Sequence, residues 1–313
     1  MIISFGKQQV LMSIKSYKTP LRYPGGKSRA CIKLDAFFPD LKMYDTFHEP
    51  FIGGGSVAIH VTKKYPKIKI WVNDLYEPLT NFWQQLQHEG EYIYKQLQQL
   101  KSRFPDPSSA KGLFLDAKKL VNDVTTDSKD RAVAFYIVNK CSFSGLTESS
   151  SFSKQASDSN FSMRGIERLP GFSKLIESWK ITCLPYEELL SDDKKVFIYL
   201  DPPYDIKDNL YGKKGEMHKT FNHDEFAKKC DEHTSHQLIS YNSSQLVKDR
   251  FSGWNVSQFN HTYTMRSVGQ YMKNQQKRQE LVIYNYGTPV PKIQFSFGEC
   301  YNYKKLENEG LVS

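Results

Sequence analysis

The stretch that decides the fold reads EPFIGGG, from Glu49 to Gly55. It follows a short apolar run at 44–47 and precedes a helix-like segment that begins at Ser56. Glycines at such a junction let the chain turn sharply from a strand into a helix and let the backbone approach a ligand closely. The stretch therefore predicts a strand, a turn and a helix beside a binding crevice, although a tight connection without a ligand would fit it too.

Short apolar runs and helix-like segments alternate on both sides of this stretch. The other runs rich in β-branched and aromatic residues occupy 68–72, 181–184, 196–200, 237–240, 254–259 and 281–286. The helix-like segments occupy 56–64, 78–87, 187–190, 224–232 and 245–250. This alternation is typical of an α/β fold with a doubly wound parallel sheet.

The middle of the chain departs from this alternation. Helical patterns dominate from 91 to 178, and nine of the 21 residues in 142–162 are serine. We therefore expect an inserted helical subdomain over 91–178 that contains a polar, Ser-rich loop. The insert divides the sheet domain into 18–90 and 179–290, and 291–313 form a C-terminal tail.

The distribution of charge along the chain, more than its total, points toward a polyanionic partner. The chain has 313 residues, a formal net charge of +9 and a pI near 9.1. Residues 1–33 hold seven bases and residues 250–279 hold five, and neither run contains an acid. Two such runs could bind the phosphates of a nucleic acid, although basic surfaces that contact only solvent have the same composition.

Other features exclude several classes of protein. The sequence contains no run of about eighteen apolar residues, so it predicts no membrane-spanning helix. The first 17 residues lack the apolar region of a secretory signal. The five cysteines are odd in number and far apart, which disfavours a disulfide framework and a zinc site. We expect a soluble, cytoplasmic protein without a metal.

The second motif is the tetrapeptide DPPY at 201–204, which follows the apolar run 196–200. Two prolines end the strand, remove two N–H donors and hold their carbonyl groups in fixed directions. The corner presents the Asp201 carboxylate, the Pro202 carbonyl and the Tyr204 ring together. This set suits a planar ring that carries an exocyclic amino group.

Two further segments carry polar groups near the predicted crevice. Asp74 follows the run 68–72, at the place where folds of this kind put a carboxylate on ribose hydroxyls, although a helix cap before Pro78 is an alternative. The loop YPGGK, from Tyr23 to Lys27, combines a turn with a base.

In this order, YPGGK, EPFIGGG, Asn73-Asp74, a helical insert and DPPY closely resemble the Dam-type, alpha-class DNA adenine-N6 methyltransferase family. The resemblance extends from Leu21 to Tyr286. It implies a Rossmann-like methyltransferase sheet with an inserted DNA-recognition subdomain, S-adenosylmethionine as cofactor and double-stranded DNA as partner. A cognate restriction endonuclease is compatible with it and is not required.

The resemblance also implies roles for single residues. The corner Asp201, Pro202, Pro203 and Tyr204 would hold a flipped target adenine. Glu49 suits the positive sulfonium and ammonium of the cofactor, and Lys27 suits its carboxylate. The full set expected at the cofactor is Tyr23, Lys27, Glu49, Phe51, Gly53, Gly55, Asp74, Tyr186 and Asp201.

DNA contacts are expected mainly from the insert. The segment 139–146 resembles a recognition motif of the family, and side chains that can reach base edges or phosphates follow it. The expected residues are Asn139, Phe143, Lys154, Gln155, Asn160, Arg164, Lys213, Lys214 and Arg266. Residues 147–155 depart from members that read GATC, so the target sequence stays open.

Two rival functions remain at this point. The same corner can hold the amino group of cytosine, so cytosine-N4 methylation is an alternative. A non-catalytic DNA-binding protein on a methyltransferase fold is another. The DPPY and glycine motifs are intact, which argues that the chain has kept its catalytic activity.

Overall fold

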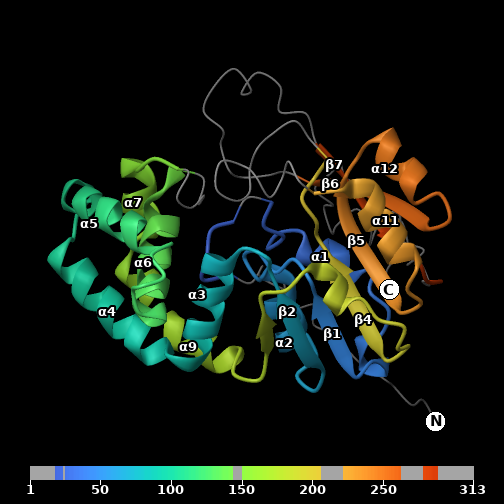
Figure 1. Cartoon of the computed structure of the whole chain (residues 1–313), viewed down its shortest axis with the longest axis horizontal. Coiled ribbons are helices and arrows are strands. Elements are labelled where there is room, and N and C mark those ends of the chain that lie inside the picture. Colours follow the sequence, from blue (N-terminus) through green and yellow to red (C-terminus); the bar gives the residue numbers. More distant parts are fainter. Residues whose placement is uncertain (1–17, 24, 144–149, 206–220, 262–277, 288–313) are drawn as a thin grey trace, which may run out of the picture.

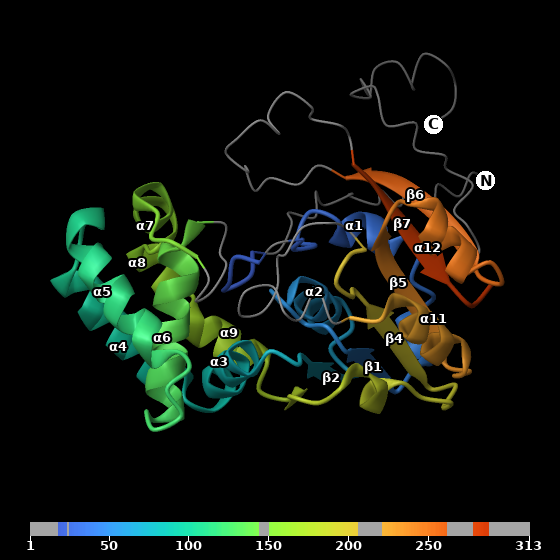
Figure 2. The same cartoon turned by 45° about the horizontal axis from the view of Figure 1, so that its top comes forward.

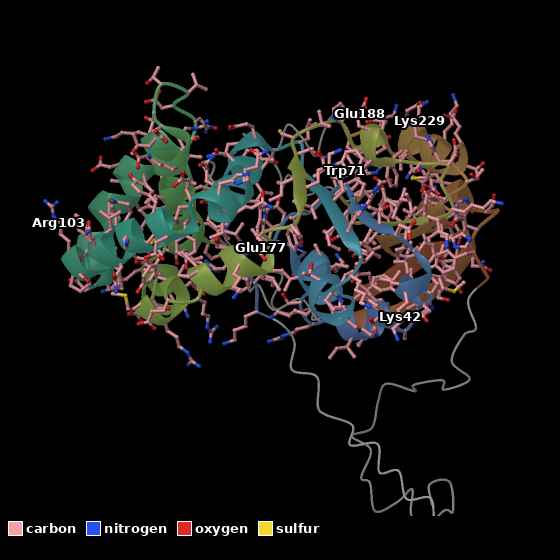
Figure 3. All side chains as sticks on the ribbon, turned by 90° about the horizontal axis from the view of Figure 1, so that it is seen from below. Lys42, Trp71, Arg103, Glu177, Glu188 and Lys229 are labelled. Carbon is pink, nitrogen blue, oxygen red and sulfur yellow. The ribbon has the colours of Figure 1, made fainter. Side chains whose placement is uncertain are left out.

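The computed structural model describes residues 18–23, 25–143, 150–205, 221–261 and 278–287. Two lobes lie side by side: a sheet flanked by helices, and a cluster of helices (Figure 1). Figure 3 shows them from below, with Arg103 on the helical lobe and Lys229 on the sheet lobe. Among the described residues, no helix has the length and apolar character needed to cross a membrane.

In these described ranges the sheet has seven strands, in the order β3-β2-β1-β4-β5-β7-β6. The strands are β1 (Thr46–Glu49), β2 (Lys69–Asn73), β3 (Lys180–Thr182), β4 (Val196–Leu200), β5 (His236–Asn242), β6 (Asn255–His261) and β7 (Arg278–Tyr284). The first five pair in parallel, which confirms the expected sheet. The last strand in the chain, β7, runs antiparallel to β5 and β6.

Helices cover both faces of this sheet. They are α1 (Cys31–Asp35), α2 (Ser56–Lys64), α11 (His223–Asp231) and α12 (Gln245–Arg250), with the short 3-10 helices η1 (Leu41–Met43) and η3 (Tyr186–Leu189). Strand β4 is buried along its whole length. Phe197 and Tyr199 belong to the core shared with α1 and α2, whereas Ile198 and Leu200 belong to the core shared with α11 and α12 (Figure 2). A strand buried on both faces reads as a continuous apolar run, which is why the sequence identified β4.

The helical lobe is built around one central helix. It comprises α3 (Glu77–His88), α4 (Gly90–Arg103), α5 (Pro107–Leu120), α6 (Ser128–Cys141), α7 (Lys154–Asn160), α8 (Met163–Ile166) and α9 (Leu169–Leu175). Every residue of α6 from Arg131 to Cys141 is buried. Phe82 of α3 stacks on Tyr136 of α6, with ring centroids 6.1 Å apart. The sheet domain thus continues into the lobe through α3.

The expectation of a polar loop in the Ser-rich stretch is wrong for residues 154–160, which form α7. Ser153 caps this helix, because its hydroxyl oxygen accepts a hydrogen bond from the Ala156 N–H. Serine is among the residues most favoured at this position. Ala156 and Ser157 then bury one side of α7. A high serine content therefore indicated a loop where one of the serines in fact begins a helix.

Candidate active site

A cavity of about 380 Å³ lies at the edge of the sheet where β1, β2, β3 and β4 end. Parallel strands bring their carboxyl ends to one edge, so segments distant in sequence meet there. The cavity is lined by Tyr23, Lys27, Glu49, Phe51, Gly53, Asp74, Tyr186, Asp201, Pro203, Phe221 and Glu225, among others. The structure therefore brings most of the residues expected at the cofactor into one place. Gly55 packs behind the turn.

The glycine turn after β1 adopts a conformation that other residues rarely take. Gly53 has φ of 47° and Gly55 has φ of 69°. A Cβ atom on Gly55 would lie 2.7 Å from Cζ2 of Trp83. The same tryptophan donates a hydrogen bond of 3.1 Å from Nε1 to the Gly53 carbonyl. The turn is thus shaped by α3 behind it as well as by its own glycines.

Substituting Gly55 by Ala should lower the free energy of unfolding by about 2 kcal/mol or more. The left-handed backbone strains an Ala residue, and the added methyl group overlaps the Trp83 ring. Urea unfolding followed by circular dichroism measures the change. Gly112→Ala is the matched control, because nothing lies within 4 Å of its Cβ position in α5 and alanine favours a helix. Equal stability of the two variants would contradict this account.

Asp74 fastens the glycine turn to the end of β2. Its Oδ2 accepts a hydrogen bond of 3.1 Å from the Gly53 N–H, and its Oδ1 accepts one of 3.1 Å from the Tyr76 N–H. Burial raises the pKa of Asp74 to about 6, while these two N–H groups lower it. The carboxylate lines the cavity. It therefore sets the shape of the turn and also presents an acceptor to a ligand.

Glu49 brings a second buried carboxylate to the cavity, at the end of β1. Its side chain is 2% exposed, and its Oε2 has no hydrogen-bond partner among the described residues. Burial, followed by the nearby Asp201 carboxylate, raises the pKa of Glu49 well above its usual value. A buried acceptor without a partner is costly unless a ligand supplies a donor. Glu49 is therefore suited to a cationic ligand.

Aromatic rings form another wall of the cavity. Phe51 stacks on Tyr186, with ring centroids 5.5 Å apart and 28° between the planes. Phe221 meets the Phe51 ring at 5.9 Å in an edge-on arrangement. The sequence did not single out Phe221, because it lies in a segment without a recognisable motif. These flat apolar surfaces suit a planar heterocycle.

The DPPY corner follows β4 and is held by Lys27, which is 3% exposed. Lys27 Nζ donates to both Asp201 carboxylate oxygens and to the Tyr204 hydroxyl, each at 2.8 Å. The Tyr204 ring stacks on Tyr241 at 5.9 Å. The family resemblance predicts that Lys27 meets the carboxylate of a cofactor, whereas in this structure its ammonium is bonded to the corner itself. Sequence spacing cannot reveal this contact, since 174 residues separate Lys27 from Asp201.

Asn139 lies inside the protein instead of on a DNA-facing surface. It is 0% exposed, its Oδ1 accepts a hydrogen bond of 2.9 Å from the Arg22 N–H, and its Nδ2 donates to the Arg22 carbonyl at 2.6 Å. Both ends of its amide are thus used by one backbone segment. In this structure Asn139 joins α6 to the loop that carries Tyr23, so the expected DNA contact needs a correction.

The other residues expected to contact DNA divide into three groups. Phe143, Lys154, Gln155 and Arg164 are exposed. Asn160 is half-buried and its Nδ2 donates to the Ala156 carbonyl at 2.9 Å. Lys213, Lys214 and Arg266 lie outside the described residues.

A Rossmann-like sheet with a glycine turn after β1 and an Asp-Pro-Pro-Tyr corner after β4 defines this chain as a methyltransferase. The chain belongs to the D12 class N6 adenine-specific DNA methyltransferase family, which matches residues 23–265. Its activity is therefore that of an adenine-specific DNA methyltransferase. The family resemblance and the α/β methyltransferase fold predicted from the sequence are confirmed.

Three relatives illustrate the range of similarity. The chain is 26% identical over 208 residues to the Type II methyltransferase M.MjaIII of Methanocaldococcus jannaschii, covering 62% of this chain and 70% of the relative. It is 22% identical over 282 residues to the Type II methyltransferase M1.LlaDCHI of Lactococcus lactis subsp. cremoris, covering 85% and 94%. A DNA N-6-adenine-methyltransferase of Escherichia phage P1 is 28% identical over 126 residues, covering 40% and 15%.

Proposed function

We propose that this protein transfers the methyl group of S-adenosylmethionine to N6 of an adenine flipped out of duplex DNA. The cofactor occupies the cavity, and the adenine enters the corner at 201–204. One observation carries the proposal: Asp201 and Pro203 line the same cavity as Glu49 and Asp74. Amino-binding and cofactor-binding groups therefore share one space.

The charge of the cavity supports a cationic cofactor. Its described lining includes five carboxylates, on Glu49, Asp74, Glu187, Asp201 and Glu225, and one ammonium, on Lys27. The unpartnered Oε2 of Glu49 suits an ammonium or sulfonium group. Asp74 suits the ribose hydroxyls, and the ring pair Phe51 and Tyr186 suits the adenine part.

The corner would activate and aim the amino group of the target base. The N6 lone pair of adenine is delocalised into its ring, which makes N6 a poor nucleophile. Hydrogen bonds from N6–H to the Asp201 carboxylate and the Pro202 carbonyl would raise electron density on N6 and orient it for in-line attack. When bound, S-adenosylmethionine supplies an electrophilic methyl group. The side chain of Asp201 is 20% exposed, so a substrate can reach it.

An adenine in duplex DNA must flip out of the helix to reach such a corner. Flipping costs a few kcal/mol, which stacking on the Tyr204 ring would offset. We propose that the exposed side chains Phe143, Lys154, Gln155 and Arg164 contact DNA near the flipped base. Two relatives are named Type II methyltransferases, which supports a place beside a restriction endonuclease of the same specificity.

The test is to incubate the purified protein with unmethylated plasmid DNA and methyl-labelled S-adenosylmethionine. We expect label in DNA and, after digestion, N6-methyldeoxyadenosine by mass spectrometry. Single-molecule sequencing of the product then gives the sequence around each modified base. Label in N4-methyldeoxycytidine, or no label at all, would overturn the proposal.

A further inference from the structure

Glu280 is a buried carboxylate that the proposed mechanism leaves without a role. Its side chain is 1% exposed. It lies near the beginning of β7, and its register partner in β5 is Asn242 at the end of that strand. Because β7 runs antiparallel, its beginning reaches the edge of the sheet at which the parallel strands end. The antiparallel strand β7 thus delivers an acid to the DPPY corner.

The contacts of Glu280 connect it to both functional groups of that corner. Lys27 Nζ lies 3.1 Å from Glu280 Oε1 and 2.8 Å from each oxygen of Asp201. The Tyr204 hydroxyl donates a hydrogen bond of 2.6 Å to the same Oε1 of Glu280. One ammonium is therefore shared by two carboxylates, and the ring expected to stack on the target base is held by one of them.

We propose that Glu280 is a positioning residue for methyl transfer. By sharing Lys27 with Asp201, it keeps the Asp201 carboxylate basic enough to accept the proton that leaves N6. By accepting the Tyr204 hydroxyl, it fixes the ring on which the adenine stacks. This inference rests on the proposed function. It adds Glu280 as the acid that sets the basicity of Asp201, the proton acceptor.

The proton balance shows why the basicity of Asp201 matters. As the N6–carbon bond forms, the sulfur–carbon bond breaks and sulfur keeps the electron pair. N6 then carries the methyl group, two protons and a positive charge. One proton passes to an Asp201 oxygen, which leaves a neutral methylamino group and a neutral carboxyl group, and solvent later takes the proton. A carboxylate paired alone with an ammonium is a weak acceptor, and a second carboxylate on that ammonium weakens the pairing.

The groups around Asp201 act on its pKa in both directions. Burial raises the pKa of Asp201 to about 6, Lys27 lowers it and Glu280 raises it. Within the described part of the chain, the other titratable groups that face Asp201 or Glu280 are Glu49 of β1, Tyr199 of β4, Tyr204 and Lys33 of α1. Since catalysis requires ionised Asp201, the rate should fall as the pH drops through the pKa of this group. Removing the negative charge of Glu280 should therefore move that fall to lower pH.

The experiment measures the single-turnover rate of methyl transfer between pH 5 and pH 8 for wild-type protein and Glu280→Gln. Glutamine keeps an accepting oxygen for Lys27 and Tyr204 but removes the charge. We expect the acidic limb of the rate profile to move down by about one pH unit, with a several-fold lower plateau because a weaker base accepts the proton more slowly. Glu188→Gln, an exposed carboxylate outside the cavity lining, should reproduce the wild-type profile.

A Glu280→Gln limb that coincides with the wild-type limb, or lies above it, would overturn the inference. Glu280→Asp provides the second variant: it keeps the charge and shortens the side chain, so the limb should stay in place while the plateau falls. Wild-type turnover in Glu280→Asp would show that the contacts to Lys27 and Tyr204 are dispensable. Absence of transfer by the wild-type protein would instead defeat the proposed function, which keeps the two failures distinct.

Discussion

Asp201→Asn is expected to lower the single-turnover rate of methyl transfer by about 10³-fold or more while the protein stays folded. The variant loses the charged acceptor that polarises N6–H and takes its proton, and losses of 10²–10⁴-fold are common for such groups. The side chain keeps its size, so the corner keeps its shape. A labelled-methyl assay with saturating DNA and cofactor measures the effect.

The expected stability of Asp201→Asn follows from the sign of the pKa shift. Burial raises the folded-state pKa of Asp201 to about 6, above the value of an unfolded chain. Stability linked to this group is present below the unfolded pKa and is lost as the pH rises through about 6. At pH 8 the wild-type protein thus carries an ionised, largely desolvated carboxylate at a cost that Asn does not carry. Thermal unfolding at pH 8 should show no large loss for Asp201→Asn.

The control for this variant is Asp45→Asn. Asp45 is exposed and precedes β1, at the opposite edge of the sheet from the corner. The Asp45→Asn variant should transfer methyl groups at the wild-type rate. Near-normal transfer by Asp201→Asn would refute the assignment of Asp201 as the group that binds the amino nitrogen.

Asp74→Ala is expected to weaken S-adenosylmethionine binding by about 100-fold, as hydrogen bonds to charged groups are worth about 1.5–3 kcal/mol. The substitution removes the proposed ribose acceptor. It also leaves the N–H groups of Gly53 and Tyr76 without the oxygens that hold the turn. Isothermal titration of the DNA-free protein with the cofactor measures the dissociation constant.

Two variants separate the causes of that loss. Asp74→Asn keeps an accepting oxygen for the turn but lacks the charge, so its affinity should fall between those of wild-type protein and Asp74→Ala. Glu188→Gln, which lies outside the cavity lining, should bind the cofactor as the wild-type protein does. An unchanged dissociation constant for Asp74→Ala would remove this residue from the cofactor site.

Local patterns predicted most secondary-structure elements. The helix expected at 56–64 is α2, and the one expected at 245–250 is α12. The run at 196–200 has the same bounds as strand β4. The first strand was placed at 44–47 and lies at Thr46–Glu49, so Glu49 ends the strand itself. The short helix α1 was missed, since five residues leave little periodicity to detect.

The sequence by itself determined the class of enzyme and the identity of the corner. Its motifs are local: the glycine turn, Asp74 and DPPY each need only a few consecutive residues, and parallel strands bring them to one edge. Only the tertiary structure decided which groups share a proton or a charge. Lys27 meets Asp201, Glu280 meets Tyr204, and Asn139 holds Arg22, across separations of 174, 76 and 117 residues. Such contacts depend on the place of β7 in the sheet, on how α6 packs against the sheet domain and on how the loop before α1 lies over β4. No local spacing in the chain records these arrangements.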